Sequence, residues 1–452
     1  MKKFELKNSI YFLILFLLFS TNNSDARISI IRDAEIEKFL YDLTKPILKS
    51  ANLNSDNIKI YIVNDSSINA FVTGGQNIFI NTGLITKFKT PDALIGVIAH
   101  EVGHIASGHL ARSSENFKEA ENAVLLSYLL GLGAIAGGSP DVGSAIIMGG
   151  SQTAQRVYMK YSRSQEESAD SLAIQYLDKI SYPAFGLIDL LEYFESQNIG
   201  YKNYVDEYLL SHPVSRNRIE LIKSRTKDKK FSNHKINNKL QKRMNIIVAK
   251  LEGFLNDPDQ ILQTYSKSSD FQSRYIRSIA NYKKGNFSQA INLIKSLIKE
   301  NDKDGFIYEL YGQILFEGGY ADLAILAYQQ AIKILPKEDS ALSKINLAFT
   351  ILSKKENNSD ELDYCILLLK EAKKIEKENP FLFKNLAIIF MKKDDEARYN
   401  LALSEYNYLL GDYKKALKHA KEAKKRLPDS ATIEITEADD LIDLLKDKKN
   451  SN

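Results

Sequence analysis

The sequence predicts an α+β domain in its first half and an all-α array of helical hairpins in its second half. Between residues 34 and 225, short β-rich runs alternate with helical patterns. From about residue 268 onward, related segments recur at a spacing of 34 residues. A chain of 452 residues, 44% of them hydrophobic, is long enough to bury two or more separate cores.

The charge balance argues against a nucleic-acid partner. Lys and Arg total 61 against 57 Asp and Glu, which leaves a net charge of +4. An excess this small gives no basic footprint for DNA or RNA, so we expect neither as a partner. Cys365 is the only cysteine, so the chain forms no intramolecular disulfide.

The first 26 residues have the order of a secretory signal peptide. Lys2, Lys3 and Lys7 precede an apolar run at residues 10–19, and small residues end at Ala26. This run falls short of the roughly 20 residues that span a bilayer, which disfavours the alternative of an uncleaved membrane anchor. We therefore expect export, with cleavage after Ala26.

The elements of the first domain follow in order. Apolar residues at helical spacing predict an amphipathic helix over residues 34–51. Thr90 and Pro91 supply an N-cap and a first-turn proline for a later, longer helix. Between these helices, three β-rich runs predict strands at residues 58–63, 68–73 and 77–83.

Residues 123–150 are almost uncharged, and glycines together with Ser139-Pro140-Asp141 divide them into two short apolar pieces. Each piece is shorter than a membrane span, so we expect a helical hairpin that is buried or covers a surface. Contact with a membrane surface is the alternative. Helical patterning resumes at residues 164–177 and 185–196.

A repeat marks the second half. Ala290 and Ala324 lie 34 residues apart, and each follows a Gly-containing turn with an aromatic residue; the same turn precedes Ala416. This period, with a small residue and a terminal proline, is the tetratricopeptide signature. Cys365 replaces the small alanine in a degenerate copy displaced by an insertion at residues 355–360, and we expect it to be buried and unreactive. A further helix pair is expected at residues 380–392.

The segment HEVGH places two histidines four residues apart. On a helix, His100 and His104 then share one face and can hold one metal ion, while Glu101 can take a proton from a water at that ion. The longer pattern HExxHxxGxxH is broken by Ser107 and Leu110. His109 is one residue out of that register and is expected to point about 140° away from His104.

A third ligand is expected from the helix at residues 164–177. Glu166 shares its face with Ala169 and Asp170, and an inward glutamate needs a cationic partner because burying an unpaired charge is costly. Asp170 is placed to accept a hydrogen bond from a ligating imidazole. The alternative is a surface salt bridge between Glu166 and Arg163, which lies one turn earlier.

His212 precedes Pro213 and a helix expected to begin near Ser215. A histidine at such an entry can donate a hydrogen bond to the oxyanion that forms during peptide hydrolysis. The alternative is a histidine that only caps the helix.

These motifs together resemble the metallopeptidase family of the CAAX prenyl proteases and the heat-shock membrane protease. The resemblance rests on Asn69-Ala70-Phe71, Gly74-Gly75, Asn81-Thr82-Gly83-Leu84, HEVGH, SRSQEESAD and SHPVSRNRI. It is closest to exported members with a tetratricopeptide tail and covers essentially the whole mature chain. It implies an HExxH zinc metalloprotease domain of the gluzincin type with a small β-sheet.

The resemblance also implies roles for individual residues. His100, His104 and Glu166 bind one zinc ion, Glu101 and His212 act in catalysis, and Asp170 lies just outside the ligands. Apart from the resemblance, we expect Arg163 to lie just outside the ligands as well. Zinc is expected from the ligand set of two histidines and one glutamate. An edge strand that holds extended substrate is expected at Asn77, Ile78, Phe79, Ile80 and Asn81.

The implied function is cleavage of misassembled outer-membrane proteins in the periplasm, with the repeats binding clients or the assembly machinery. The alternative is a chaperone or scaffold whose protease site is closed or rarely used. An integral membrane protease is disfavoured because no later segment reaches spanning length. The expected parts are a protease domain at residues 27–225, a linker with a connecting helix at 226–267, repeats at 268–440 and a polar tail at 441–452.

Overall fold

The computed structural model divides into two compact units, Met1–Leu251 and Glu252–Asn452. It describes residues 30–73, 76–109, 161–198, 207–226, 231 and 234–450. The expected signal peptide and the apolar segment at residues 123–150 lie outside these described residues. Within them, no helix combines the length and the apolar character that crossing a membrane requires.

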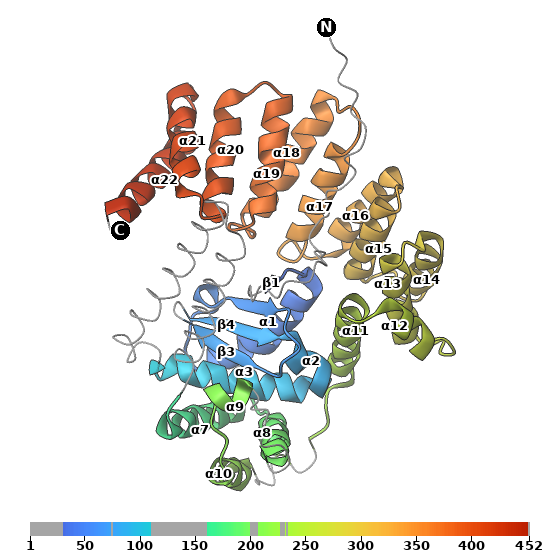
Figure 1. The fold of residues 1–452 in the computed structure, drawn as a ribbon, viewed down its shortest axis with the longest axis vertical. Helices are drawn as coiled ribbons and strands as arrows, with labels where there is room; N and C mark the ends of the chain where they lie inside the picture. Colours follow the sequence, from blue (N-terminus) through green and yellow to red (C-terminus); the bar gives the residue numbers. More distant parts are fainter. Residues whose placement is uncertain are drawn as a thin grey trace, which may run out of the picture. The chain divides into compact units, whose positions relative to one another are not determined.

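The first unit contains a four-stranded sheet (Figure 1). Its strands are β1 (Ile30–Ile31), β2 (Ile60–Val63), β3 (Ala70–Thr73) and β4 (Asn77–Asn81), in the order β1-β2-β4-β3. β2 and β4 are parallel, and the other two pairs are antiparallel. Tyr61, Phe79 and Phe71 stack in sequence across three strands, which fixes the register on one face.

The expectation that residues 77–81 form an edge strand is wrong. β4 lies in the interior of the sheet because it pairs with β2 on one side and with β3 on the other. β3 folds back onto the outer side of β4 and does not pair with β2. The edge on this side of the sheet is therefore β3.

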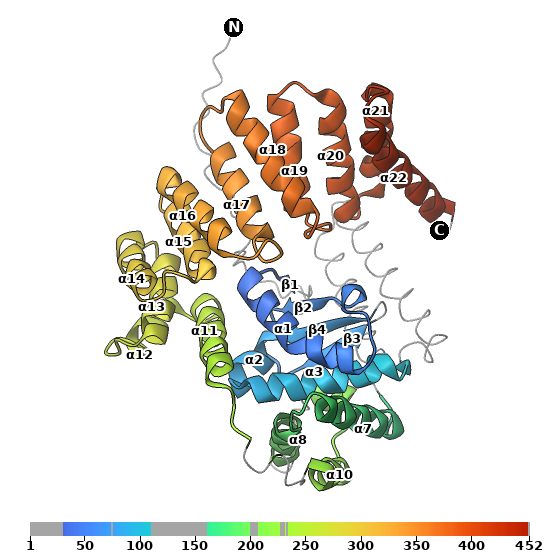
Figure 2. The same cartoon turned by 180° about the vertical axis from the view of Figure 1, so that it is seen from behind.

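Two long helices pack against the sheet, and further helices lie beyond the second of them (Figure 2). The helix α1 packs against β2, while α3 packs against α1 and β3. Thr90 caps α3 by accepting a hydrogen bond from the Ala93 amide, and Pro91 occupies the first turn, as predicted. The helices of this unit are α1 (Ala34–Ser50), α2 (Thr82–Phe88), α3 (Pro91–Ala106), α7 (Arg163–Lys179), α8 (Phe185–Asn198), α9 (Glu207–Ser211) and α10 (Arg216–Thr226).

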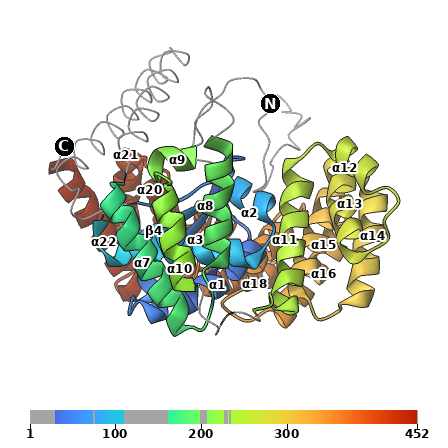
Figure 3. The ribbon, with the colours of Figure 1, turned by 90° about the horizontal axis from the view of Figure 1, so that it is seen from below.

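Two glycines on one face of α3 let its backbone approach two other helices closely. A Cβ atom at Gly96 would lie 2.5 Å from the Leu187 amide nitrogen of α8, and one at Gly103 would lie 2.6 Å from the Ala169 carbonyl oxygen of α7. Only glycine fits both positions. The helix α10 packs against both α7 and α8, and Figure 3 shows these three helices side by side. The HEVGH segment is thus held directly against the helix that carries Glu166.

The second unit is an array of antiparallel helices. The helix α11 (Asn238–Leu255) leads into it. The array consists of α12 (Pro258–Thr264), α13 (Phe271–Lys283), α14 (Phe287–Glu300), α15 (Gly305–Glu317), α16 (Ala321–Ile334), α17 (Ala341–Leu352), α18 (Ser359–Lys373), α19 (Pro380–Lys392), α20 (Glu396–Leu409), α21 (Tyr413–Arg426) and α22 (Thr432–Asn450).

The repeat signature explains the turns of this array. Gly285, Gly319 and Gly411 have φ of 75°, 84° and 78°, a left-handed conformation that side chains other than glycine rarely adopt. Cys365 is fully buried in α18, as predicted, and burial raises the pKa of its thiol to about 12.

Two expectations for the second unit are wrong. Residues 380–392 form the single helix α19, not a helix pair, because 13 residues suffice for only one helix of ordinary length. The segment that begins at residue 441 is not merely a polar tail. It continues the helix α22 as far as Asn450, because Leu441, Ile442 and Leu445 are buried.

Candidate metal centre

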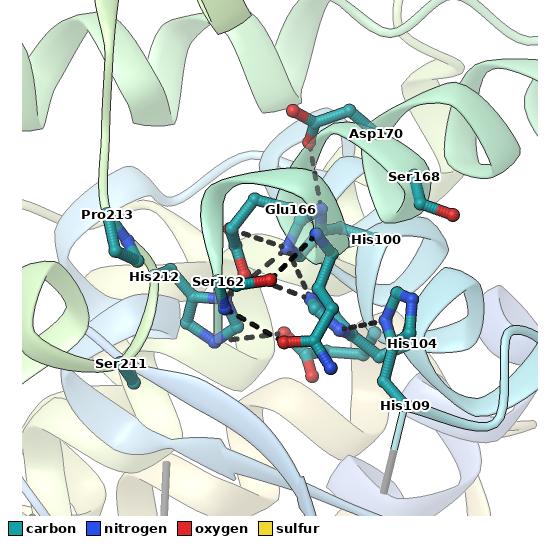
Figure 4. Close-up of polar contacts among 12 residues, drawn as sticks. His100, His104, His109, Ser162, Glu166, Ser168, Asp170, Ser211, His212 and Pro213 are labelled. Atoms are coloured by element: carbon teal, nitrogen blue, oxygen red, sulfur yellow. Dashed lines mark hydrogen bonds and ion pairs between the residues drawn. The ribbon is translucent and has the colours of Figure 1, made fainter. Parts of the chain in front are cut away.

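Four side chains converge in the first unit from three separate segments (Figure 4). His100 and His104 lie one turn apart on α3, Glu166 lies in the first turn of α7, and His212 follows α9. All four are completely buried. One potential ligand atom from each lies within 4.8 Å of the others.

The spacing of these atoms suits a single small metal ion. His100 Nε2 lies 3.1 Å from His104 Nε2, and Glu166 Oε1 lies 3.2 Å from His104 Nε2. His212 Nδ1 lies 3.4 Å from His100 Nε2 and 3.1 Å from Glu166 Oε1. Ligand bonds of about 2.0–2.1 Å in a tetrahedron place neighbouring ligand atoms about 3.3 Å apart. The donors are thus spaced as the corners of one coordination shell.

Contacts outside this shell orient two of the imidazole rings. His100 Nδ1 lies 2.9 Å from Asp170 Oδ1, so a proton on Nδ1 leaves the lone pair of Nε2 directed at the other donors. His104 Nδ1 lies 3.0 Å from His109 Nδ1, and the ring of Tyr161 stacks on His104 at 3.7 Å. Each ring therefore presents the same nitrogen, Nε2, to the shared centre.

His109 does not point away from His104 as its register predicts. The helix α3 ends at Ala106, and Gly108 has φ of 61°, so the chain turns back before residue 109. The rule of 100° per residue no longer applies after the helix ends. His109 contacts the side of the His104 ring that faces away from the shared centre, and it is not one of the four converging donors.

Arg163 is exposed, so placing it beside the ligands is wrong. The arginine at the site is Arg218 of α10, which is 1% exposed. Its Nη1 lies 2.7 Å from Glu166 Oε2, while Nε and Nη2 lie 2.7 and 2.9 Å from the two oxygens of Asp170. The sequence contains a signal for its burial alone, because Arg218 shares the inward face of α10 with Ile219 and Ile222.

The charges of the centre act on one another through short contacts. Burial by itself lowers the pKa of His100, but Asp170 and Glu166 outweigh it and raise that pKa to about 10. Burial lowers the pKa of His104 to about 3. Burial raises the pKa of Asp170, yet Arg218 and His100 more than reverse this and the net shift is downward. Positive charge from Arg218 and His100 thus keeps the buried Asp170 ionised.

Glu101 stands beside the four donors. Both of its carboxylate oxygens are buried and lack a hydrogen-bond partner within the described part of the chain. The closest ionic group is His212, whose Nε2 lies 3.6 Å from Glu101 Oε1. Burial raises the pKa of Glu101, and His212 and His100 oppose this. A buried acceptor without a donor indicates a position where a small polar molecule can bind.

The part of the chain that carries the four converging residues matches a known peptidase family. Residues 32–226 match peptidase family M48, and residues 277–339 match a tetratricopeptide repeat family. The beta-barrel assembly-enhancing protease of Yersinia pestis is 24% identical over 325 residues, which cover 71% of this chain and 66% of the relative.

Two further relatives carry the same or a similar name. The beta-barrel assembly-enhancing protease of Escherichia coli strain K12 is 26% identical over 198 residues, 43% of this chain and 40% of the relative. A protein of Vibrio cholerae with the same name, given there as putative, is 26% identical over 290 residues, 61% of this chain and 58% of the relative. In each case, the chain matches less than two thirds of the relative's length.

Proposed function

Because the chain carries a peptidase family M48 domain followed by tetratricopeptide repeats, we propose that it is a periplasmic zinc endopeptidase that degrades misassembled outer-membrane proteins. The single observation that carries the proposal is the buried group of His100, His104 and Glu166 with Glu101 beside it. The names of the relatives support the choice of outer-membrane β-barrel proteins as clients. The expected signal peptide supports export.

His100, His104 and Glu166 would hold the ion, because imidazole and carboxylate donors in this number suit zinc. When bound, zinc lowers the pKa of a water and polarises the substrate carbonyl. Glu101 would accept the proton of the attacking water, because its carboxylate lies beside the donors and has no hydrogen-bond partner among the described residues. Arg218 and Asp170 keep Glu166 and His100 in place.

Because β4 lies in the interior of the sheet, the strand expected to hold substrate is β3 rather than β4. An extended peptide adds to the edge of a sheet, and the strand at the edge next to β4 is β3. Backbone hydrogen bonds to Ala70–Thr73 would position the peptide with little demand on its side chains. The repeats would bind the clients or the machinery that assembles them, as helical arrays of this kind do.

The proposed client class is tested by competition. Purified protein is incubated with equal amounts of an unfolded outer-membrane β-barrel protein and an unfolded soluble protein of similar length. Preferential cleavage of the β-barrel protein is expected, and chelation should stop both reactions. Equal cleavage rates for both substrates would show a peptidase without the proposed preference for β-barrel proteins.

The third ligand is tested by metal content. We expect Glu166→Ala to lower bound zinc to roughly a tenth or less of the wild-type value. Removing a residue that only hydrogen-bonds to a ligand already costs about 10–100-fold in metal affinity, and losing a ligand itself costs more. Zinc per chain is measured by atomic emission after dialysis. Glu167→Ala, on the exposed side of the same helix turn, is the matched control. A normal zinc content in Glu166→Ala would show that a residue other than Glu166 is the third ligand.

His212 favours a second candidate function. Its Nδ1 occupies the fourth corner of the donor group, and four protein ligands leave no open position for water. In that arrangement the protease site is closed, and the protein acts mainly as a chaperone or scaffold until His212 withdraws. In the first candidate, His212 instead donates a hydrogen bond to the oxyanion after it has moved out of the ligand shell.

His212→Ala separates the two candidates. If His212 stabilises the oxyanion, we expect cleavage of an unfolded substrate to fall by about 10²-fold or more, with zinc retained. The measurement is the initial rate of cleavage together with zinc per chain. A rate above that of the wild type would favour the closed-site function, because removing the fourth donor would then open the metal.

A further inference from the structure

The outward side of the repeat helices differs between repeats at equivalent positions. Four hairpins can be compared through the small residue that is buried in their second helix. These residues are each 0% exposed: Ala290 in α14, Ala324 in α16, Cys365 in α18 and Ala416 in α21. The residue before each of them and the residue two after it face outward. These outward residues are Gln289 and Asn292 in α14, Leu323 and Leu326 in α16, Tyr364 and Leu367 in α18, and Lys415 and Lys418 in α21.

The hairpins of α16 and α18 therefore carry apolar side chains where those of α14 and α21 carry polar ones. Leu323, Leu326, Tyr364 and Leu367 are 48%, 61%, 38% and 54% exposed, and we call them the α16–α18 patch. Both helices, α16 and α18, pack on α17. The buried Ala324 and Cys365 lie in one hydrophobic cluster. The polar residues of α14 and α21 show that the repeat fold does not need apolar groups here.

Such a patch is costly to leave in water. Monomeric proteins rarely expose contiguous apolar areas beyond a few hundred Å², and larger areas usually mark a contact surface. Three of the four residues of the α16–α18 patch are leucines exposed by about half. The charges around the patch indicate which kind of surface covers it.

Each of the two helices has acidic residues at its beginning and lysines towards its end. In α18, the exposed Asp360 and Asp363 precede Tyr364. The exposed Lys370 follows Leu367 in the same helix, and the exposed Lys374 comes directly after the helix ends. In α16, the exposed Asp322 precedes Leu323, and the exposed Lys333 lies two turns beyond Leu326. Some of these charges already have partners, since Asp363 contacts Lys393 and Asp322 lies 3.9 Å from Lys354. Lys374 and Asp360 are equally distant from Leu367, at seven residues on either side.

From this arrangement we infer that the α16–α18 patch is the contact surface between two copies of this chain. A two-fold axis near Leu326 and Leu367 places the helices of the copies antiparallel. The leucines then meet in the middle, and the acidic start of each helix lies opposite the lysine-bearing end of its partner. The same charges would be unfavourable against an anionic lipid surface, because the acidic residues border the patch directly.

The inference goes beyond the proposed peptidase activity and does not depend on it. It is tested with the purified full-length mature chain by sedimentation velocity and light scattering between about 1 and 200 μM. We expect a concentration-dependent dimer. Leu326→Glu with Leu367→Glu should raise the dissociation constant by about tenfold or more, equivalent to about 1.4 kcal/mol. Asn292→Glu with Lys418→Glu is the control at the equivalent positions of α14 and α21 and should leave the dimer intact.

A charge reversal tests the antiparallel arrangement itself. Asp360→Lys alone and Lys374→Asp alone each bring like charges together and should weaken the dimer, whereas the double variant should restore it. Unchanged thermal unfolding checks that these exposed substitutions leave the fold intact. A chain that stays monomeric at every concentration, a dimer that survives both leucine substitutions, or a failure of the double variant to restore the dimer would each overturn the inference.

Discussion

A Glu101→Gln substitution is expected to reduce kcat/KM for cleavage of an unfolded substrate by roughly 10²–10⁴-fold while the zinc content stays unchanged. The amide has nearly the shape of the carboxylate but cannot accept the proton of the attacking water. Glu101 is not one of the converging donors, and its nearest ionic contact, to His212 Nε2, is 3.6 Å long. The metal site should therefore survive the change.

The same variant should be as stable as the wild type, or more stable. Both oxygens of Glu101 are buried without a hydrogen-bond partner among the described side chains, so the charge is held at the expense of stability. Thermal unfolding of the metal-loaded forms measures this. Glu167→Gln changes an exposed glutamate to the same amide and should affect neither rate nor stability. Equal cleavage by Glu101→Gln and the wild type would show that Glu101 does not take part in the reaction.

The local elements of the fold could be predicted because their signals are local. Thr90 and Pro91 mark the start of α3, and glycines that need a left-handed backbone mark the turns of the repeats. The order of the strands could not be predicted in the same way. Whether β3 pairs with β2 or with the far side of β4 depends on packing against α3, which no short stretch of sequence encodes.

In the candidate site, too, the features set by nearby residues could be predicted, and those set by distant contacts could not. The spacing of His100 and His104 determines that they share a helix face, and Glu166 among alanines indicates an inward carboxylate. Arg218 could not be assigned to the site, because its contact with Asp170 joins residues 48 positions apart. The direction of His109 does not follow from its spacing to His104, because α3 ends three residues earlier.

Arg218 is expected to be the most important single side chain for the stability of the first unit. It forms the ion pairs that balance two completely buried carboxylates, those of Glu166 and Asp170. Arg218→Met keeps much of the side-chain volume but removes the guanidinium that both carboxylates contact. Breaking a buried ion pair from one side costs about 3–5 kcal/mol in the free energy of unfolding. Chemical denaturation of the metal-free protein, followed by circular dichroism, measures this loss.

Arg216→Met is the matched control, because Arg216 is exposed on the same helix, two residues earlier. It should change the free energy of unfolding by no more than about 0.5 kcal/mol. The loss in Arg218→Met should be smaller with zinc than with chelator, because an ion bound at Glu166 supplies positive charge that the arginine no longer provides. Equal losses in both forms would show that Arg218 acts on Asp170 alone. A loss no larger than that of the control would show that the buried carboxylates do not need this arginine.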